Sequence, residues 1–108
     1  LQNETIKLAS MQTIGLGHIQ NIGATYVLSV GVAHIVNIGM TQKTNVGQSI
    51  SMHAGKTVVI EAGETLVLKA GKSTLTMDSD GNIELNGNKI HIAGDTVVDI
   101  DSKLIDLN

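Results

Sequence analysis

Two short segments contain the residue types that end a phosphate-binding loop. They are residues 55–57 (Gly-Lys-Thr) and residues 71–73 (Gly-Lys-Ser). Such a loop cradles phosphates with its backbone N–H groups and needs another glycine five residues before the glycine that precedes the lysine. Ile50 and Leu66 occupy that position here. The sequence therefore predicts a structural glycine followed by a solvated lysine in both places, and no nucleotide site.

Residues 78–82, with the sequence Asp-Ser-Asp-Gly-Asn, have the alternating oxygen donors that begin a calcium-binding loop. That loop requires a glycine at its sixth position and a bidentate carboxylate at its twelfth. Ile83 and Lys89 stand at these two positions. We therefore expect a plain Asp-Gly turn between two strands, and no metal or other cofactor.

No serine, histidine and carboxylate show a spacing that would activate a nucleophile, so we predict no catalytic residue and no enzymatic activity. A uniform fibrous repeat also offers no obvious cleft for a substrate. With no site for catalysis expected, the function of this chain must be sought in the elements that repeat along it.

The glycines reveal that repeat, because eight of them follow one another at a constant spacing of eight residues. Each is preceded by an apolar residue that is small or branched, and one repeat earlier Ile6-Lys7 keeps the apolar position without the glycine. The repeat glycines are Gly15, Gly23, Gly31, Gly39, Gly47, Gly55, Gly63 and Gly71. A fixed period of this kind is typical of a fibrous or solenoid protein.

Within one repeat the polarity alternates with a period of two, which indicates β-strands. Residues one, three and five before a glycine share one parity, which we call the pre-glycine face; Tyr26-Leu28-Val30 and Leu66-Leu68-Ala70 are two examples. The opposite parity carries polar residues such as Asn21 and Asn37, but also Ile19, Val27 and Ile35. A helix is disfavoured, because a glycine every eight residues costs about 1 kcal/mol each relative to alanine.

Beyond Gly71 the strict spacing ends while the alternation continues, and turn residues separate the short apolar pairs. These turns are predicted at residues 80–82, 86–88 and 94–95. We therefore predict an all-β chain of about thirteen short strands forming one domain over residues 1–108. Residues 1–71 would be its regular part and residues 72–108 its less regular distal part.

Composition and charge narrow the possible functions further. The chain has one aromatic residue (Tyr26), no proline, no cysteine and a net charge of −3. From Asp78 onward, acidic residues outnumber lysines by five. Nothing resembles the basic stripe with interleaved aromatic residues that holds phosphates, so we expect no nucleic-acid partner.

Two arrangements fit a triangular turn made of three eight-residue repeats. In one, a single chain packs its own successive turns against each other; in the other, three chains wind together and each strand lies between strands of its partners. A glycine at each corner permits a backbone conformation that is closed to residues with a Cβ. Both arrangements use that corner, so the repeat alone does not choose between them.

Residues 19–23, 35–39 and 44–47 resemble the valine-glycine repeats of the VgrG family, and residues 74–83 and 103–108 resemble its distal end. The resemblance covers nearly the whole chain. It implies a triple-stranded right-handed β-helix, a triangular β-prism formed by an intertwined homotrimer. Phage tail spikes share this architecture and remain an alternative.

The same resemblance implies a function. Such a chain would be the non-enzymatic needle of a type VI secretion spike, assembled in the cytoplasm, delivered by the type VI machinery without a Sec signal, and driven mechanically through the target cell membrane. A conical protein with proline-alanine-alanine-arginine (PAAR) repeats would dock on the tip. The predicted tip residues are Ile105, Asp106, Leu107 and Asn108.

The histidines bear on the interior of such a prism. His18 and His34 have the parity of the pre-glycine face, so in a trimer each would form a ring of three around the axis. Phage spikes of this architecture hold iron with histidines two residues apart, but Gln20 and Val36 stand at those places here. We therefore predict no metal.

Two further alternatives belong to other functional classes. A single-chain β-solenoid would serve as a stalk or adhesin, and its mass in solution would identify it. Solenoid acyltransferases use six-residue repeats and a catalytic histidine at a trimer interface, so a period of eight argues against an enzyme of that kind.

Overall fold

The computed structural model describes residues 8–108. Ile6 and Lys7, the residues of the earliest repeat, lie outside this range. The chain divides into two units, Leu1–Asn45 and Val46–Asn108. No helix occurs in the described residues, and so none there could cross a bilayer.

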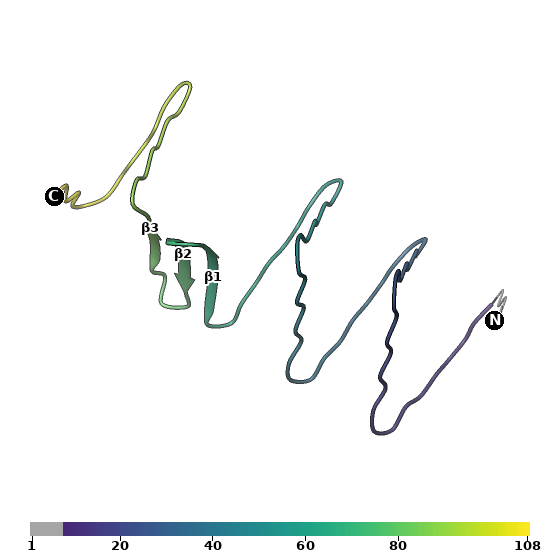
Figure 1. The fold of residues 1–108 in the computed structure, drawn as a ribbon. Coiled ribbons are helices and arrows are strands. Elements are labelled where there is room, and N and C mark those ends of the chain that lie inside the picture. Colours follow the sequence, from purple (N-terminus) through teal and green to yellow (C-terminus); the bar gives the residue numbers. More distant parts are fainter. Residues whose placement is uncertain (1–7) are drawn as a thin grey trace. The chain divides into compact units, whose positions relative to one another are not determined.

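In the described part of the first unit, the backbone runs in extended segments that are separated by bends (Figure 1). Apart from a bend at Leu8, the bends fall at residues 15–16, 23–24, 31–32 and 39–40, and each of these begins at a repeat glycine. None of these segments is a strand, because none has a hydrogen-bonded neighbour among the described residues. The local structure of this unit, in its described residues, is therefore extended backbone whose N–H and C=O groups make no backbone–backbone hydrogen bonds.

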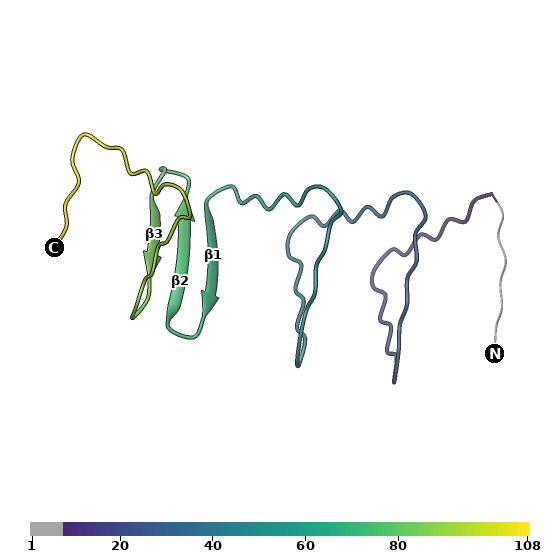
Figure 2. The ribbon, with the colours of Figure 1, turned by 90° about the horizontal axis from the view of Figure 1, so that it is seen from above.

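The second unit begins in the same way, with bends at residues 47–48, 55–56 and 63–64. Three strands follow: β1 (Thr65–Ala70), β2 (Ser73–Asp78) and β3 (Ile83–Asn86). They form one antiparallel sheet in the order β1-β2-β3, and Figure 2 shows the three arrows side by side with alternating direction.

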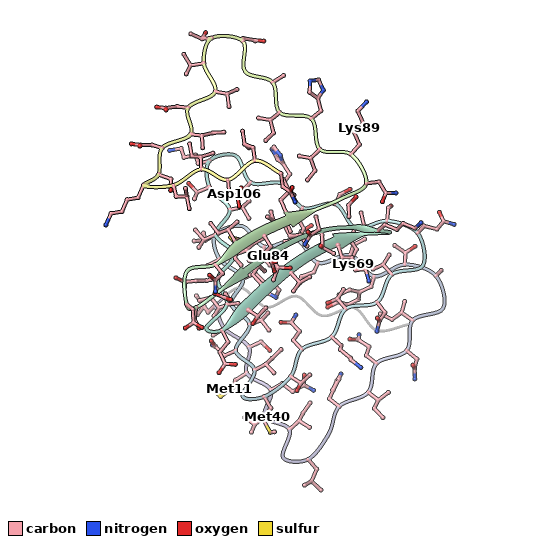
Figure 3. All side chains as sticks on the ribbon, turned by 90° about the vertical axis from the view of Figure 1, so that its left-hand side faces the viewer. Met11, Met40, Lys69, Glu84, Lys89 and Asp106 are labelled. Carbon is pink, nitrogen blue, oxygen red and sulfur yellow. The ribbon has the colours of Figure 1, made fainter. Side chains whose placement is uncertain are left out.

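The alternation of the sequence gives this sheet two different faces. Residues directly opposite each other in an antiparallel pair lie on the same face. The pairing therefore makes two apolar rows, Leu66–Met77–Ile83 and Leu68–Leu75–Leu85. The other face carries the rows Val67–Thr76–Glu84 and Lys69–Thr74–Asn86; the side chains of Lys69 and Glu84 are labelled in Figure 3.

Two different turns join the strands. Gly71 and Lys72 connect β1 to β2, and Gly71 has a φ of 56° while no residue other than glycine has a positive φ in the described chain. A positive φ at the first position of a two-residue hairpin loop is characteristic of a type II′ turn, which favours glycine there. The predicted turn at residues 80–82 is confirmed between β2 and β3, where Gly81 has a φ of 91°.

No side chain in the described residues is buried. The least exposed ones are half-buried and belong to the sheet: Leu66, Thr74, Leu75, Thr76 and Met77. The chain exposes 11951 Å², which is about twice the roughly 5,700 Å² expected for a compact monomer of this mass. Residues 8–108 thus form no hydrophobic core by themselves.

The all-β character predicted from the sequence is confirmed at this coarse level. The number of strands differs, since the described residues contain three where the alternation predicts about thirteen. The reason is physical: a strand is defined by its backbone partners, and outside β1–β3 the extended segments have none among residues 8–108.

Candidate functional site

The pre-glycine face carries an apolar residue just before each repeat glycine, and most of its large apolar side chains are about half-exposed, with Met52 an exception at 77%. The residue just before each of the first five glycines is 45–51% exposed: Ile14, Ile22, Val30, Ile38 and Val46. On the opposite parity, Ile19 is 88% exposed and Val27 and Ile35 are each 77% exposed. The two parities are therefore distinct, and both expose apolar surface.

Seven of the eight repeat glycines have neither a steric nor a conformational reason among the described residues. A Cβ added at Gly15, Gly23, Gly31 or Gly39 would meet no atom within 4 Å, and the same holds for Gly47, Gly55, Gly63 and Gly71. Of these eight, only Gly71 has a positive φ. A backbone conformation closed to residues with a Cβ, expected at each corner, is thus seen at Gly71, and the other seven repeat glycines have no positive φ.

Gly94 provides a contrast. A Cβ there would lie 2.5 Å from the carbonyl oxygen of Val97 and 3.0 Å from its carbonyl carbon. The turn predicted at residues 94–95 is present as a bend at residues 95–96, and Gly94 permits the close approach. Gly94 is thus a glycine that its own chain requires, because a Cβ there would clash. Seven of the repeat glycines show neither such a clash nor a positive φ.

The backbone hydrogen bonds are confined to one part of the chain. Within the described residues, all of them lie between Glu64 and Asn86. The segments between residues 8 and 63 therefore present their N–H and C=O groups to the surroundings. Such groups are obligatory hydrogen-bonding sites, and an extended edge that leaves them open invites pairing with another chain.

The apolar face of the sheet is the other extensive interaction surface. A shallow hollow beside it is lined by Leu68, Ala70, Ser73, Leu75 and Leu85 of this face, together with Lys69 and Thr74 of the opposite parity. Leu68 is 53% exposed, Leu85 54% and Ile83 71%. Three strands with one uncovered apolar face are at the lower limit of independent stability, so this face needs a covering surface.

Asp78 holds the turn between β2 and β3. Its Oδ1 accepts hydrogen bonds from the backbone N–H groups of Asp80 and Asn82, both at 3.0 Å, and its Oδ2 accepts one from Nδ2 of Asn82 at 3.1 Å. The donors from Asn82, first its backbone N–H and then its side chain, hold the pKa of Asp78 below its ordinary value. Both carboxylate oxygens are therefore committed to the turn.

The remaining residues singled out in the sequence are dispersed. Ile105 is 50% exposed and Leu107 90%, and residues 104–108 form no strand. The only side-chain hydrogen bond described near them runs from the Leu104 N–H to Oγ of Ser102, at 3.3 Å. His18 and His34 are exposed, and no group of three or more potential metal ligands occurs in the described residues.

Sequence reasoning missed two features of the β1–β3 sheet, namely the hairpin at Gly71-Lys72 and the role of Asp78. The signal for the hairpin was the end of the eight-residue spacing after Gly71. The signal for Asp78 was its position two residues before Asp80, the spacing at which an aspartate side chain accepts a hydrogen bond from the backbone N–H.

Comparison with protein-family models finds no match, and comparison with curated proteins finds none either. The repeat, the open backbone and the exposed apolar faces are therefore the features that bear on function.

Proposed function

We propose that this chain is the needle of a trimeric, membrane-puncturing spike of the VgrG type, without catalytic activity. Three copies would wind into a triangular β-prism, each extended segment lying between segments of its two partners. The observation that carries the proposal is the open backbone of residues 8–63, where the bends recur every eight residues and no backbone partner occurs in the described part of the chain.

The exposed surface supports three chains over one. A single-chain solenoid gains its stability by pairing its own successive turns, and the described residues before Glu64 make no such pairs. The area exposed in excess of a compact monomer is several times the roughly 800 Å² per partner of a standard interface. Only a partner that runs along most of the chain would cover it, and further copies with the same repeat meet that condition.

The repeat glycines support the same arrangement. In a prism, each corner brings backbones of different chains close together, and a glycine allows that approach. The contact that excludes a Cβ at Gly39 would then come from a partner chain. This accounts for a glycine with ordinary φ and no neighbour within its own chain.

The mechanical role follows from the interleaving. Force along the axis is shared by three chains whose strands cannot separate one at a time. The spike would be delivered by the type VI machinery into a target cell, and its distal end, rich in acidic residues, would not be attracted to anionic lipid. Penetration would therefore be driven by force rather than by lipid binding.

Light scattering tests the assembly. The proposal expects three times the monomer mass of 11.3 kDa at micromolar concentration. A mass equal to that of the monomer would contradict it and favour the single-chain solenoid that serves as a stalk or adhesin.

Docking of the tip protein tests the function itself. Ile105, Asp106, Leu107 and Asn108 would contact a conical PAAR-repeat protein whose underside is neutral to basic. Removing residues 104–108 should abolish binding to the cognate conical protein while the trimer mass, less the deleted residues, is kept. Undiminished affinity would place the docking site elsewhere.

A further inference from the structure

The antiparallel sheet differs from the other described segments, because its strands pair with one another while the outer edges of β1 and β3 stay open. Besides these two edges, it leaves uncovered two complete apolar rows of side chains. Covering this surface requires face-to-face packing, whereas the extended segments require edge-to-edge pairing.

We propose that the apolar face of β1–β3 packs against the same face of two further copies of this chain, around a common threefold axis. The proposal rests on the trimer proposed above and specifies one surface within it. In this arrangement β2 would be the innermost strand, and Leu75 and Met77 would meet their copies at the axis.

The parity of the strands supports this choice of face. Leu66, Leu68 and Ala70 on β1 are the residues five, three and one before Gly71, so they belong to the pre-glycine face. The hairpin pairs them with Met77, Leu75 and Ser73, which places β2 on the same side. The apolar side of the repeats thus continues into the sheet without a change of parity.

The chemistry of the face supports a second copy as its occupant. Both apolar rows lack charged residues, whereas the opposite face carries Lys69 and Glu84. An occupant must therefore be apolar and free of charge, and the same rows of another copy satisfy both conditions. Sheets that pack face to face interdigitate their side chains at a separation of about 10 Å, and the shallow hollow lined by Leu68, Leu75 and Leu85 provides room for side chains from another sheet.

Two adjacent residues of β2 provide a matched test. Leu75 and Thr76 are both half-buried, and they lie on opposite faces of the sheet. Leu75→Asp places a charge on the proposed contact, and Thr76→Asp places the same charge on the other face. Light scattering should show loss of the trimer for Leu75→Asp and its retention for Thr76→Asp.

Because an aspartate at Leu75 can also prevent folding of the sheet, cross-linking provides the second measurement. The chain contains no cysteine, so Leu75→Cys and Thr76→Cys each introduce a single thiol. A short bifunctional maleimide should link two chains of the Leu75→Cys trimer and should leave Thr76→Cys unlinked.

The outcomes separate the two proposals. A parent chain with the mass of a monomer would overturn the proposed function as well as this inference. A trimeric parent in which Thr76→Cys links as readily as Leu75→Cys, or in which Leu75→Asp keeps the trimer, would overturn only the inference. A dimeric parent linked through Leu75→Cys would indicate a sandwich of two sheets and overturn the threefold packing.

Discussion

Asp78 shows how a single exposed carboxylate can define a turn. It accepts three hydrogen bonds from residues 80–82 through its two side-chain oxygens, and its own backbone oxygen accepts one from the N–H of Gly81 at 3.2 Å. The residue types of this segment are those that begin a calcium loop, but the oxygens are used to close the chain on itself. Sequence reasoning predicted the turn correctly from Asp80-Gly81-Asn82. It could not predict which carboxylate closes the turn, since that depends on the backbone path over four residues.

The lowered pKa of Asp78 predicts a stability that depends on pH. A carboxylate whose pKa is lower in the folded than in the unfolded chain stabilises the fold above the unfolded value, and this contribution is lost as the pH falls through the folded value. The advantage of the parent over Asp78→Asn in thermal midpoint should be complete well above the ordinary pKa of 3.8. It should shrink as the pH is lowered below that value.

Asp80→Asn serves as the control for this experiment. It removes a neighbouring carboxylate while the Asp80 backbone N–H remains available to Asp78. Its difference from the parent should be small throughout. A difference for Asp78→Asn that stays constant down to about pH 2 would show that the ionised carboxylate is not what stabilises the turn.

At the scale of elements, the hairpin of β1 and β2 could not be predicted, because its sequence keeps the spacing of the repeat. Gly71 is in register with seven other glycines, and Leu66, Leu68 and Ala70 have the same parity whether the chain bends at a corner or reverses. The difference lies in the φ of one residue, which is 56° at Gly71 and not positive at the other seven. Residue type cannot reveal it, since glycine is compatible with both conformations.

Gly71→Ala should therefore destabilise the protein, because the alanine would have to adopt the positive φ of Gly71. A left-handed φ costs a residue with a Cβ about 1–2 kcal/mol relative to glycine, and three chains would each bear that cost. Lys72→Ala is the matched control, because Lys72 has no positive φ. Thermal unfolding should show a lower midpoint for Gly71→Ala and little change for Lys72→Ala; equal midpoints would argue against a type II′ turn.

At the scale of the whole molecule, the described chain has extended segments, bends and a sheet, but no core. The alternation and the spacing of glycines predicted the first two, because both are local properties. The partners of the extended segments could not be read from the sequence, since the period of eight fits pairing within one chain and pairing among three. The seven glycines without a positive φ are the residues at which an isolated chain and an assembly of chains make different predictions.

Gly39→Val tests that difference directly. In the isolated chain a Cβ at Gly39 meets nothing within 4 Å, so the substitution would be nearly neutral there. In the proposed prism the side chain would meet a partner at all three copies of that corner, and we expect a clearly lower melting temperature with loss of trimer. Asn37→Val adds the same side chain on the opposite parity and should have little effect. Superimposable melting curves for the two variants would show that no other chain approaches Gly39.

The antiparallel sheet has one more consequence for an assembly built from identical repeats. Three chains with a glycine every eight residues could slip past one another by one repeat and still align glycine with glycine and apolar residue with apolar residue, which leaves several alignments nearly equal in energy. A single non-repeating element removes this degeneracy, because a slipped chain would bring its sheet opposite an extended segment and leave both apolar rows uncovered. The sheet, which occurs once in the described chain, would thus fix the register of the three chains relative to one another.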